Sequence, residues 1–142
     1  MNNVIAIDAS VAFKWIVERE KNRNKALLLY KNHTEGKETI IVPRFILLEI
    51  ANALVTKSKT TSAFVQSGLE VILEAKLSIY KIKDKDILKA SRLAKKYKTT
   101  VYDMLYAVIA KNKGCDLITA DKKFIEKTGF KFAKHISEIK FP

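Results

Sequence analysis

The chain alternates short apolar runs with longer segments whose apolar residues recur at helical spacing. The short runs predict strands at residues 3–7, 39–42, 77–82 and 116–120, with an edge strand near 130–133. The longer segments predict helices at residues 10–17, 20–34, 44–57, 62–75, 86–97 and 101–112, and a short helix from residue 122. Strands separated by helices predict an α/β fold, a single α/β/α sandwich with a mostly parallel central sheet.

All 142 residues are expected to form one domain, because no linker, low-complexity stretch or internal repeat interrupts this pattern. The one cysteine, Cys115, excludes an internal disulfide framework. No apolar run approaches the roughly 20 residues that span a bilayer, and the N-terminus lacks the features of a secretory signal. We therefore expect a cytoplasmic protein without a membrane partner.

The charge of the chain indicates an anionic partner. There are 27 Lys and Arg against 15 Asp and Glu, a formal net charge of +12, and residues 72–142 carry +9 of it. The densest stretch, residues 81–98, has 8 basic and 2 acidic side chains. A solvated helix face is one explanation of this stretch, and attraction of nucleic acid is the other. Because lysine outnumbers arginine 23 to 4, contact with phosphates is expected rather than base readout.

Four acidic residues stand in apolar surroundings. Asp8 directly follows the run VIAI, and Asp121 directly follows DLITA. Glu49 is the only charge in FILLEIANALV, residues 45–55, and Asp103 is the only charge between residues 101 and 110. Ligands of parallel α/β sheets bind beyond the carboxyl ends of the strands, so Asp8 and Asp121 lie where a site is expected.

Helix capping is an alternative explanation for three of these acids. Asp8 and Asp121 stand at strand-to-helix junctions, and Asp103 follows Thr100 at the spacing of a capping box. Glu49 resists this explanation, because it falls about one and a half turns into its helix, where an unpaired carboxylate is costly. Glu49 needs a cation, a proton or a buried partner. One shared metal ion would account for all four acids.

The expected metal ligands are oxygen atoms only. Mg²⁺ and Mn²⁺ prefer such ligands and usually keep several waters and a substrate phosphate. His33 and His135 stand in no metal-binding motif and are expected at the surface. An oxygen-only site on a basic protein indicates metal-assisted hydrolysis of phosphodiester bonds.

Three segments together resemble the PIN-domain proteins, and specifically the VapC-type ribonuclease toxins. IDASVAFKW, residues 7–15, resembles the opening strand, acid and small residue of that family. VPRFILLEIANAL, residues 42–54, resembles its Pro-led helix with an inward Glu. VYDMLYAVIAKNKGCDLITADKKF, residues 101–124, resembles its Asp-led helix, glycine, and strand that ends in Thr and then Asp.

The resemblance implies a Rossmann-like fold and a metal-dependent endoribonuclease that uses Mg²⁺ or Mn²⁺. It further implies a homodimer held inactive by a small VapB-like antitoxin, the pair forming a type II toxin–antitoxin system. The implied metal-binding and catalytic quartet is Asp8, Glu49, Asp103 and Asp121. Ser10 and Thr119 match positions whose hydroxyls support the quartet. One departure is Lys123, which stands where many relatives carry a further acid and which puts a second metal site in doubt.

Several other side chains are expected to act around the quartet. Asp8 and Asp103 are expected to hold the main metal with Asp121, while Glu49 orients the nucleophile. Candidate contacts to RNA phosphates are the lysines of residues 81–98 and, individually, Lys14, Arg44 and Lys122, with surface solubility as the alternative for Lys122. The aromatic residues Phe13, Trp15 and Tyr106 could stack on bases, but their helical spacing favours the core.

Three other classes of protein remain as alternatives. A PIN-like module could bind RNA or protein without cleaving it. A phosphoacceptor signalling domain also collects acids at strand ends, but it places adjacent acids after its first strand, whereas Ala9 and Ser10 follow Asp8 here. A phosphatase with an Asp nucleophile would carry a second Asp two residues later, where Ser10 stands. Both of these rank below a nuclease.

Overall fold

Five strands of the computed structural model form one sheet, in which every neighbouring pair is parallel. The structure describes residues 3–56 and 59–141. In chain order the strands are β1 (Asn3–Ile7), β2 (Glu38–Pro43), β3 (Ser78–Tyr80), β4 (Asp116–Thr119) and β5 (Ala133–His135). Their order in the sheet is β3-β2-β1-β4-β5, so β1 is central and its carboxyl end lies between those of β2 and β4. The predicted parallel sheet is confirmed.

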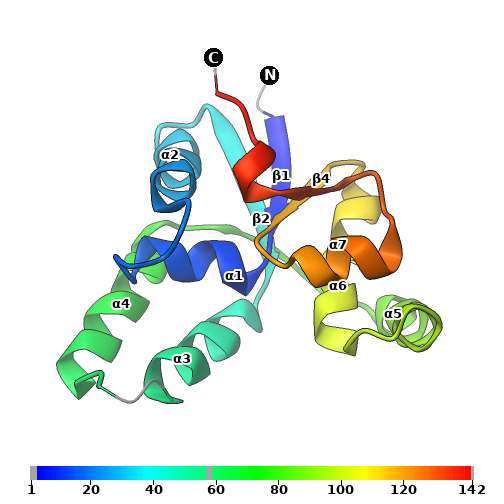
Figure 1. The fold of residues 1–142 in the computed structure, drawn as a ribbon, viewed down its shortest axis with the longest axis horizontal. Coiled ribbons are helices and arrows are strands. Elements are labelled where there is room, and N and C mark those ends of the chain that lie inside the picture. The colour runs from blue at the N-terminus through cyan, green and yellow to red at the C-terminus, as the bar shows by residue number, and fades with distance from the viewer. Residues whose placement is uncertain (1–2, 57–58, 142) are drawn as a thin grey trace.

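Helices cover both faces of the sheet, as the predicted α/β/α sandwich requires (Figure 1). They are α1 (Ala9–Ala12), α2 (Arg23–Thr34), α3 (Ile46–Thr56), α4 (Ser62–Glu74), α5 (Asp84–Tyr97), α6 (Val101–Lys113) and α7 (Lys122–Thr128), with short 3₁₀ turns η1 (Phe13–Trp15) and η2 (Ile136–Glu138). In Figure 1, α2 and α4 lie on one side of the strands, and α5, α6 and α7 lie on the other. Within the described residues, no helix is long and apolar enough to cross a bilayer.

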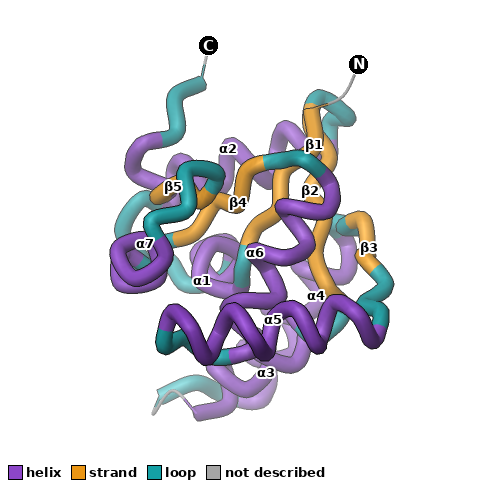
Figure 2. The backbone as a smooth tube through the Cα atoms, turned by 90° about the vertical axis from the view of Figure 1, so that its right-hand side faces the viewer, coloured by secondary structure: helices purple, strands orange, loops and turns teal. Residues whose placement is uncertain are grey.

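Helix α6 is the central helix of its layer. Every residue from Met104 to Ala110 is buried, because α6 packs between the sheet and α5 (Figure 2). Its neighbours in the sheet are β1, β2 and β4, the same strands whose carboxyl ends carry the candidate site. A helix buried on all sides holds its first turn rigidly, and Asp103 lies in that turn.

The strand and helix bounds differ from the sequence predictions where local contacts intervene. Helix α5 begins at Asp84, two residues early, because the carboxylate of Asp86 accepts a hydrogen bond from the backbone N–H of Lys83 (3.0 Å). The edge strand lies at Ala133–His135 rather than at 130–133, since the chain first makes a turn in which the N–H of Ala133 donates to the carbonyl of Phe130 (3.1 Å). The predicted helix over residues 10–17 is divided into α1 and η1, and the end of the helix predicted over 44–57 lies outside the described residues.

The predicted surface position of His135 is wrong. The residue is 8% exposed in β5, and its Nδ1 accepts a hydrogen bond from the backbone N–H of Ser137 (3.1 Å). His33 is half-buried, with Nε2 beside the carbonyl of Ala75 (3.0 Å) and Nδ1 accepting from the N–H of Ile40. Both imidazoles therefore hydrogen-bond to the backbone, and no pattern in the sequence indicates these contacts.

Candidate functional site

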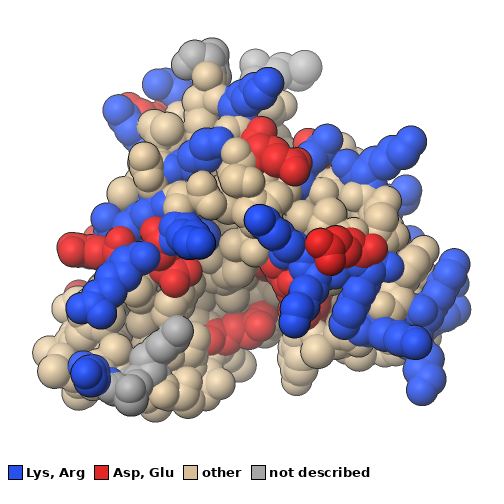
Figure 3. Space-filling view, viewed as in Figure 1, with Lys and Arg blue, Asp and Glu red and all other residues tan. Residues whose placement is uncertain are grey.

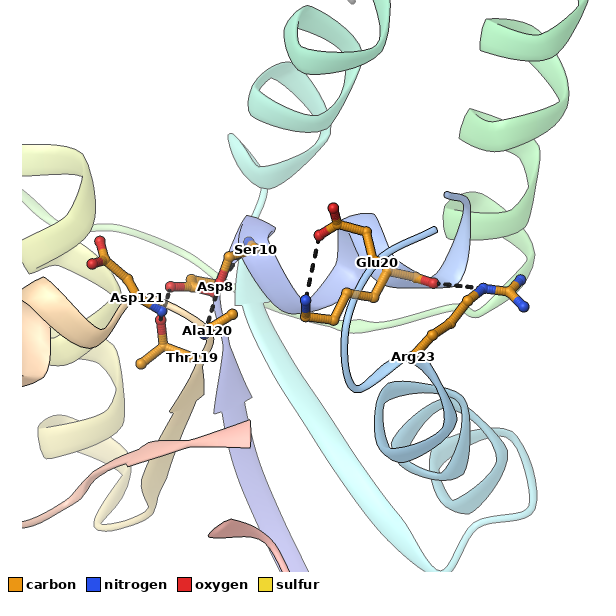
Figure 4. Close-up of polar contacts among 8 residues, drawn as sticks. Asp8, Ser10, Glu20, Arg23, Thr119, Ala120 and Asp121 are labelled. Atoms are coloured by element: carbon orange, nitrogen blue, oxygen red, sulfur yellow. Dashed lines mark hydrogen bonds and ion pairs between the residues drawn. The ribbon is translucent and has the colours of Figure 1, made fainter. Parts of the chain in front are cut away.

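Asp8 lies at the carboxyl end of β1 and caps the first turn of α1. Its Oδ1 accepts hydrogen bonds from the backbone N–H (3.1 Å) and the hydroxyl (2.5 Å) of Ser10. Its Oδ2 accepts from the hydroxyl of Thr119 (2.5 Å), on the neighbouring strand β4. Figure 4 shows this cluster at the ends of the two strands. Both carboxylate oxygens are thus oriented by protein donors.

The two hydroxyls also join the strand ends to the following segment. Ser10 Oγ accepts from the backbone N–H of Ala120 (2.9 Å), and Thr119 Oγ1 accepts from that of Asp121 (3.0 Å). Each hydroxyl donates to Asp8 and accepts from the backbone after β4, so both of its hydrogen-bonding functions are used. Asp121 and Asp8 are therefore held at adjacent strand ends by one short network.

Burial, together with the negative charge of Asp103, raises the pKa of Asp8 from 3.8 to about 6, against the opposing hydrogen bonds from Ser10 and Thr119. The carboxylate carries its charge at neutral pH with little solvent to stabilise it. A cation at this position would compensate that charge.

Asp103 connects the four acids electrostatically. It lies in the first turn of α6, where its backbone N–H donates to Thr100 Oγ1 (3.1 Å). Burial raises the pKa of Asp103, and the charge of Asp121 adds to this, while Thr100 and the cation of Lys127 oppose it. In turn, the charge of Asp103 raises the pKa of both Asp8 and Glu49. All four predicted site carboxylates are thus coupled through Asp103.

Glu49 has a buried partner that the sequence analysis missed. The hydroxyl of Tyr106, a residue 1% exposed on α6, donates to Glu49 Oε1 (2.5 Å) across from α3. Burial raises the pKa of Glu49 and the charge of Asp103 adds to it, whereas the Tyr106 hydrogen bond opposes the rise. A buried tyrosine hydroxyl generally needs a polar partner, and that rule is the one signal in the sequence that could have suggested this pair.

Asp121 caps α7, because its Oδ1 accepts from the backbone N–H of Phe124 (3.0 Å). With Asp103 it lines a hollow of about 330 Å³ whose other charged lining residues are Lys98, Lys123 and Lys127. Glu49 and Ser10 line a second hollow, of about 490 Å³, which also contains Ala120, the residue before Asp121. Figure 3 shows acidic side chains inside the central hollow of this face.

The comparison with protein families decides the fold family. The family model of the PIN domain matches residues 5–130. The chain belongs to the PIN-domain family. The resemblance inferred from the three sequence segments is therefore confirmed. No protein of curated function matches this PIN domain in sequence.

Two solved structures share the fold of this PIN domain. One is the crystal structure of PAE2754 from Pyrobaculum aerophilum, with 24% identity and a TM-score of 0.71 over 96% of this chain and 93% of that one. Another is VapBC2 from Rickettsia felis bound to a DNA fragment from its promoter, with 19% identity and a TM-score of 0.62 over 93% and 96% of the respective chains. At these identities the likeness shows the fold.

The acids of this PIN domain fit a hard divalent cation by their donor chemistry. PIN domains are generally nucleases that use divalent metal ions. Asp8, Glu49 and Asp103 supply carboxylate oxygens whose mutual repulsion and burial a cation would offset. As the described side chains stand, no three of the His, Cys, Asp and Glu residues are close enough to form a ready-made metal cluster.

The predicted phosphate contacts lie in different environments. Lys14 is only 5% exposed, and its Nζ forms an ion pair with Glu20 (3.3 Å) in the hollow that Glu49 lines. Arg44 is exposed in the turn between β2 and α3, and Lys122 is exposed in the first turn of α7. Beside Asp103 and Asp121 the hollow is lined by Lys98, Lys123 and Lys127 instead.

Proposed function

We propose that this PIN domain is a Mg²⁺- or Mn²⁺-dependent endoribonuclease and the toxin of a type II toxin–antitoxin pair. The observation that carries the proposal is the coupling of four carboxylates from four elements through Asp103, at the carboxyl ends of β1 and β4. Membership of a family of nucleases and the fold shared with VapBC2 support it.

In this proposal each acid of the site has its own task. Asp8 and Asp103 hold the divalent ion, with Asp121 completing the site, and when bound the ion polarises the scissile phosphate and activates water. The hydroxyls of Ser10 and Thr119 keep the Asp8 carboxylate in one orientation. Glu49, fixed at Oε1 by Tyr106, orients the attacking water. Lys14 faces the same hollow as Glu49 and attracts the phosphodiester.

A site with four carboxylates also needs basic side chains nearby if it is to bind RNA. Four carboxylates repel a polyanion, whereas Lys98, Lys123 and Lys127 line the hollow that Asp103 and Asp121 share. Lys123, which stands where relatives carry an acid, thus adds attraction for phosphate in place of a metal ligand. An RNA-binding module without cleavage is the alternative function, and the loss of that one acid is the observation that favours it.

Cleavage assays on single-stranded RNA with Mn²⁺, and with EDTA as the metal-free control, test the function. We expect Asp8→Asn and Asp103→Asn each to slow cleavage by about 100-fold or more, while RNA affinity changes little. The matched control is Asp116→Asn, which removes one exposed carboxylate at the start of β4 and should cleave normally. Equal cleavage by wild type and both site variants would exclude these acids from the mechanism, and RNA binding without metal-dependent cleavage would favour the binding module.

We further propose that the chain forms a single domain and that two copies form a homodimer in the cytoplasm. A small VapB-like antitoxin inhibits this dimer. The VapBC2 structure is of a toxin–antitoxin complex on promoter DNA, and its fold is shared over nearly the whole chain. Light scattering tests the dimer. Co-expression with the product of a short upstream reading frame tests the antitoxin, which should abolish cleavage at a stoichiometric ratio.

A further inference from the structure

A second polar hollow lies away from the acids, at the edge strand β3. Its volume is about 740 Å³, larger than either hollow beside the acids. Residues of β3, the start of α5 and the end of α6 line it. Five of its lining residues are lysines, namely Lys81, Lys83, Lys85, Lys89 and Lys113. We call this hollow the distal basic pocket.

The floor of the distal basic pocket is a fixed polar network. The hydroxyl of Tyr80 donates to Asp86 Oδ2 (2.9 Å), and the side-chain amide of Asn112 donates to Tyr80 (2.9 Å) and to Asp86 Oδ1 (3.1 Å). The backbone N–H of Lys83 donates to the same carboxylate. Asp86 is the one acid in the lining, is 2% exposed, and already accepts three donors. The five lysines therefore outweigh the one negative charge in the lining of the pocket.

The lysines around this floor form no ion pair with a described acid, although the charge of Lys85 acts on the carboxylate of Asp86 and lowers its pKa. The two ion pairs among the described residues join Lys14 to Glu20 and Lys37 to Glu35, so the lysines of the distal basic pocket take part in neither. Lys113 lies over the ring of Tyr80 (5.8 Å), which places its ammonium at the wall of the pocket. Five unpaired cations around one concave polar surface match a phosphate group or a chain of phosphates.

Helix α5 connects the distal basic pocket with the catalytic acids. Lys85, Lys89, Arg92 and Lys96 follow one another at spacings of four, three and four residues, which places them on one face of the helix. The helix ends at Tyr97, and the next residue, Lys98, lines the hollow of Asp103 and Asp121. In Figure 3, basic side chains gather over α5, α6 and α7 on the right of the molecule. The stripe extends about 17 Å, and helix α5 as a whole, with 14 residues, is about 21 Å long.

We propose that the distal basic pocket is a second phosphate-binding site, which anchors a single-stranded RNA whose backbone runs along α5 to the acids. The inference rests on the proposed function in taking RNA as the ligand. At a phosphate spacing of about 3.4 Å along one strand, the length of α5 corresponds to about six nucleotides between the anchor and the cleaved bond. Affinity should therefore depend on RNA length, and lysine contacts should make it independent of sequence.

The test compares two triple variants of equal charge. Lys85→Gln, Lys89→Gln and Lys113→Gln neutralise the distal basic pocket, whereas Lys21→Gln, Lys31→Gln and Lys140→Gln neutralise lysines outside it. Both triples lower the formal net charge from +12 to +9. Binding of a labelled RNA of about 12 nucleotides, twice the length that α5 spans, is measured by anisotropy in EDTA between about 50 and 200 mM salt.

We expect the distal triple to weaken binding at low salt by about 10-fold or more and to reduce the slope of log K against log salt by about 2, roughly 0.7 for each lost contact. The control triple should stay within about twofold of wild type, and the loss should be smaller for an RNA of about 3 nucleotides, which is too short to reach from the pocket to the acids. Equal weakening by both triples, or no weakening by the distal triple, overturns the proposal. So does a distal triple that binds RNA normally but loses an acidic protein partner.

Two features keep this test independent of other failures. Binding in EDTA requires no cleavage, so a wild-type protein that does not cleave RNA would refute the proposed function without affecting the anchor. A distal triple that cleaves and binds RNA like wild type would refute the anchor alone. Should the first triple unfold, as judged by circular dichroism, a triple at the exposed Lys81, Lys83 and Lys85 makes the same prediction.

Discussion

Neutralising Asp8 should stabilise the metal-free protein. Burial and the charge of Asp103 hold the pKa of Asp8 at about 6, against an ordinary value of 3.8, so ionising it in the folded state is about 2 units harder. At about 1.4 kcal/mol per unit, the ionised carboxylate costs about 3 kcal/mol of folding stability at neutral pH. Asn retains the helix cap on Ser10 but loses about 1 kcal/mol at Thr119. The expected net gain of Asp8→Asn is about 2 kcal/mol.

The effect of Asp8 on folding stability should depend on pH. Because the folded-state pKa of Asp8 is raised, its stabilising contribution is complete below about pH 4 and is lost as the pH rises through about 6. In EDTA at pH 7.5, Asp8→Asn should therefore melt roughly 4–8 °C above wild type, whereas near pH 4 this advantage should vanish. Thermal and urea denaturation at the two pH values measure the difference.

A matched variant and a metal titration complete the experiment. Asp116→Asn removes an exposed carboxylate from the same sheet and should change the melting temperature little at either pH. Saturating Mn²⁺ should stabilise wild type, because it binds the folded acids, and should leave Asp8→Asn almost unchanged. If Asp8→Asn is no more stable than wild type in EDTA at pH 7.5, the charge of Asp8 does not carry the cost that its surroundings imply.

Two further predictions concern neighbours of the acids. Tyr106→Phe keeps the buried ring but removes the hydroxyl that orients the Glu49 carboxylate, and it should lower kcat by about 10- to 100-fold with little change in KM. Tyr102→Phe, at a residue 61% exposed, is its control, and equal rates for the two variants would contradict a positioning role. Glu20→Gln removes the ion-pair partner of the buried Lys14 and should tighten RNA binding about threefold in a filter-binding assay. The control is Glu18→Gln, at an exposed residue, which should have a smaller effect. Equal affinities of the two variants would exclude Lys14 from phosphate binding.

The fold was predictable because the carboxyl-terminal halves of its central strands β1, β2 and β4 are buried. The run VIAI becomes the central strand β1, and continuous apolar strands of this kind alternate with helices in parallel α/β sheets. Element ends were less predictable, since they depend on individual contacts. The N-terminus of α5 was placed two residues late, because periodicity gives no weight to the carboxylate of Asp86 that caps Lys83. A turn closed by the hydrogen bond from the Ala133 N–H to the Phe130 carbonyl likewise delays β5 to Ala133–His135.

The site residues that could be predicted are those whose charge is unusual among their apolar sequence neighbours. Glu49 attracted notice because a charge in an apolar helix needs a partner, but the partner itself, Tyr106, lies 57 positions away along the chain and is indistinguishable from a core aromatic in the sequence. Lys14 is the opposite case. Nothing in IDASVAFKW shows that this lysine is buried and paired with Glu20, because both properties arise from the chain turning back after η1.

Capping and metal binding, which were rival explanations of the acids, turn out to be compatible. Asp8 accepts from Ser10 N and Asp121 accepts from Phe124 N, so each caps a helix as predicted from local sequence. A cap also fixes its carboxylate at the start of a helix, which in a parallel sheet is the edge where ligands bind. Capping explains how these acids are oriented, but it does not explain why Asp103, whose side chain caps no helix, repels the charges of both Asp8 and Glu49. That shared repulsion, rather than any one acid, is what a cation at the ends of β1 and β4 would relieve.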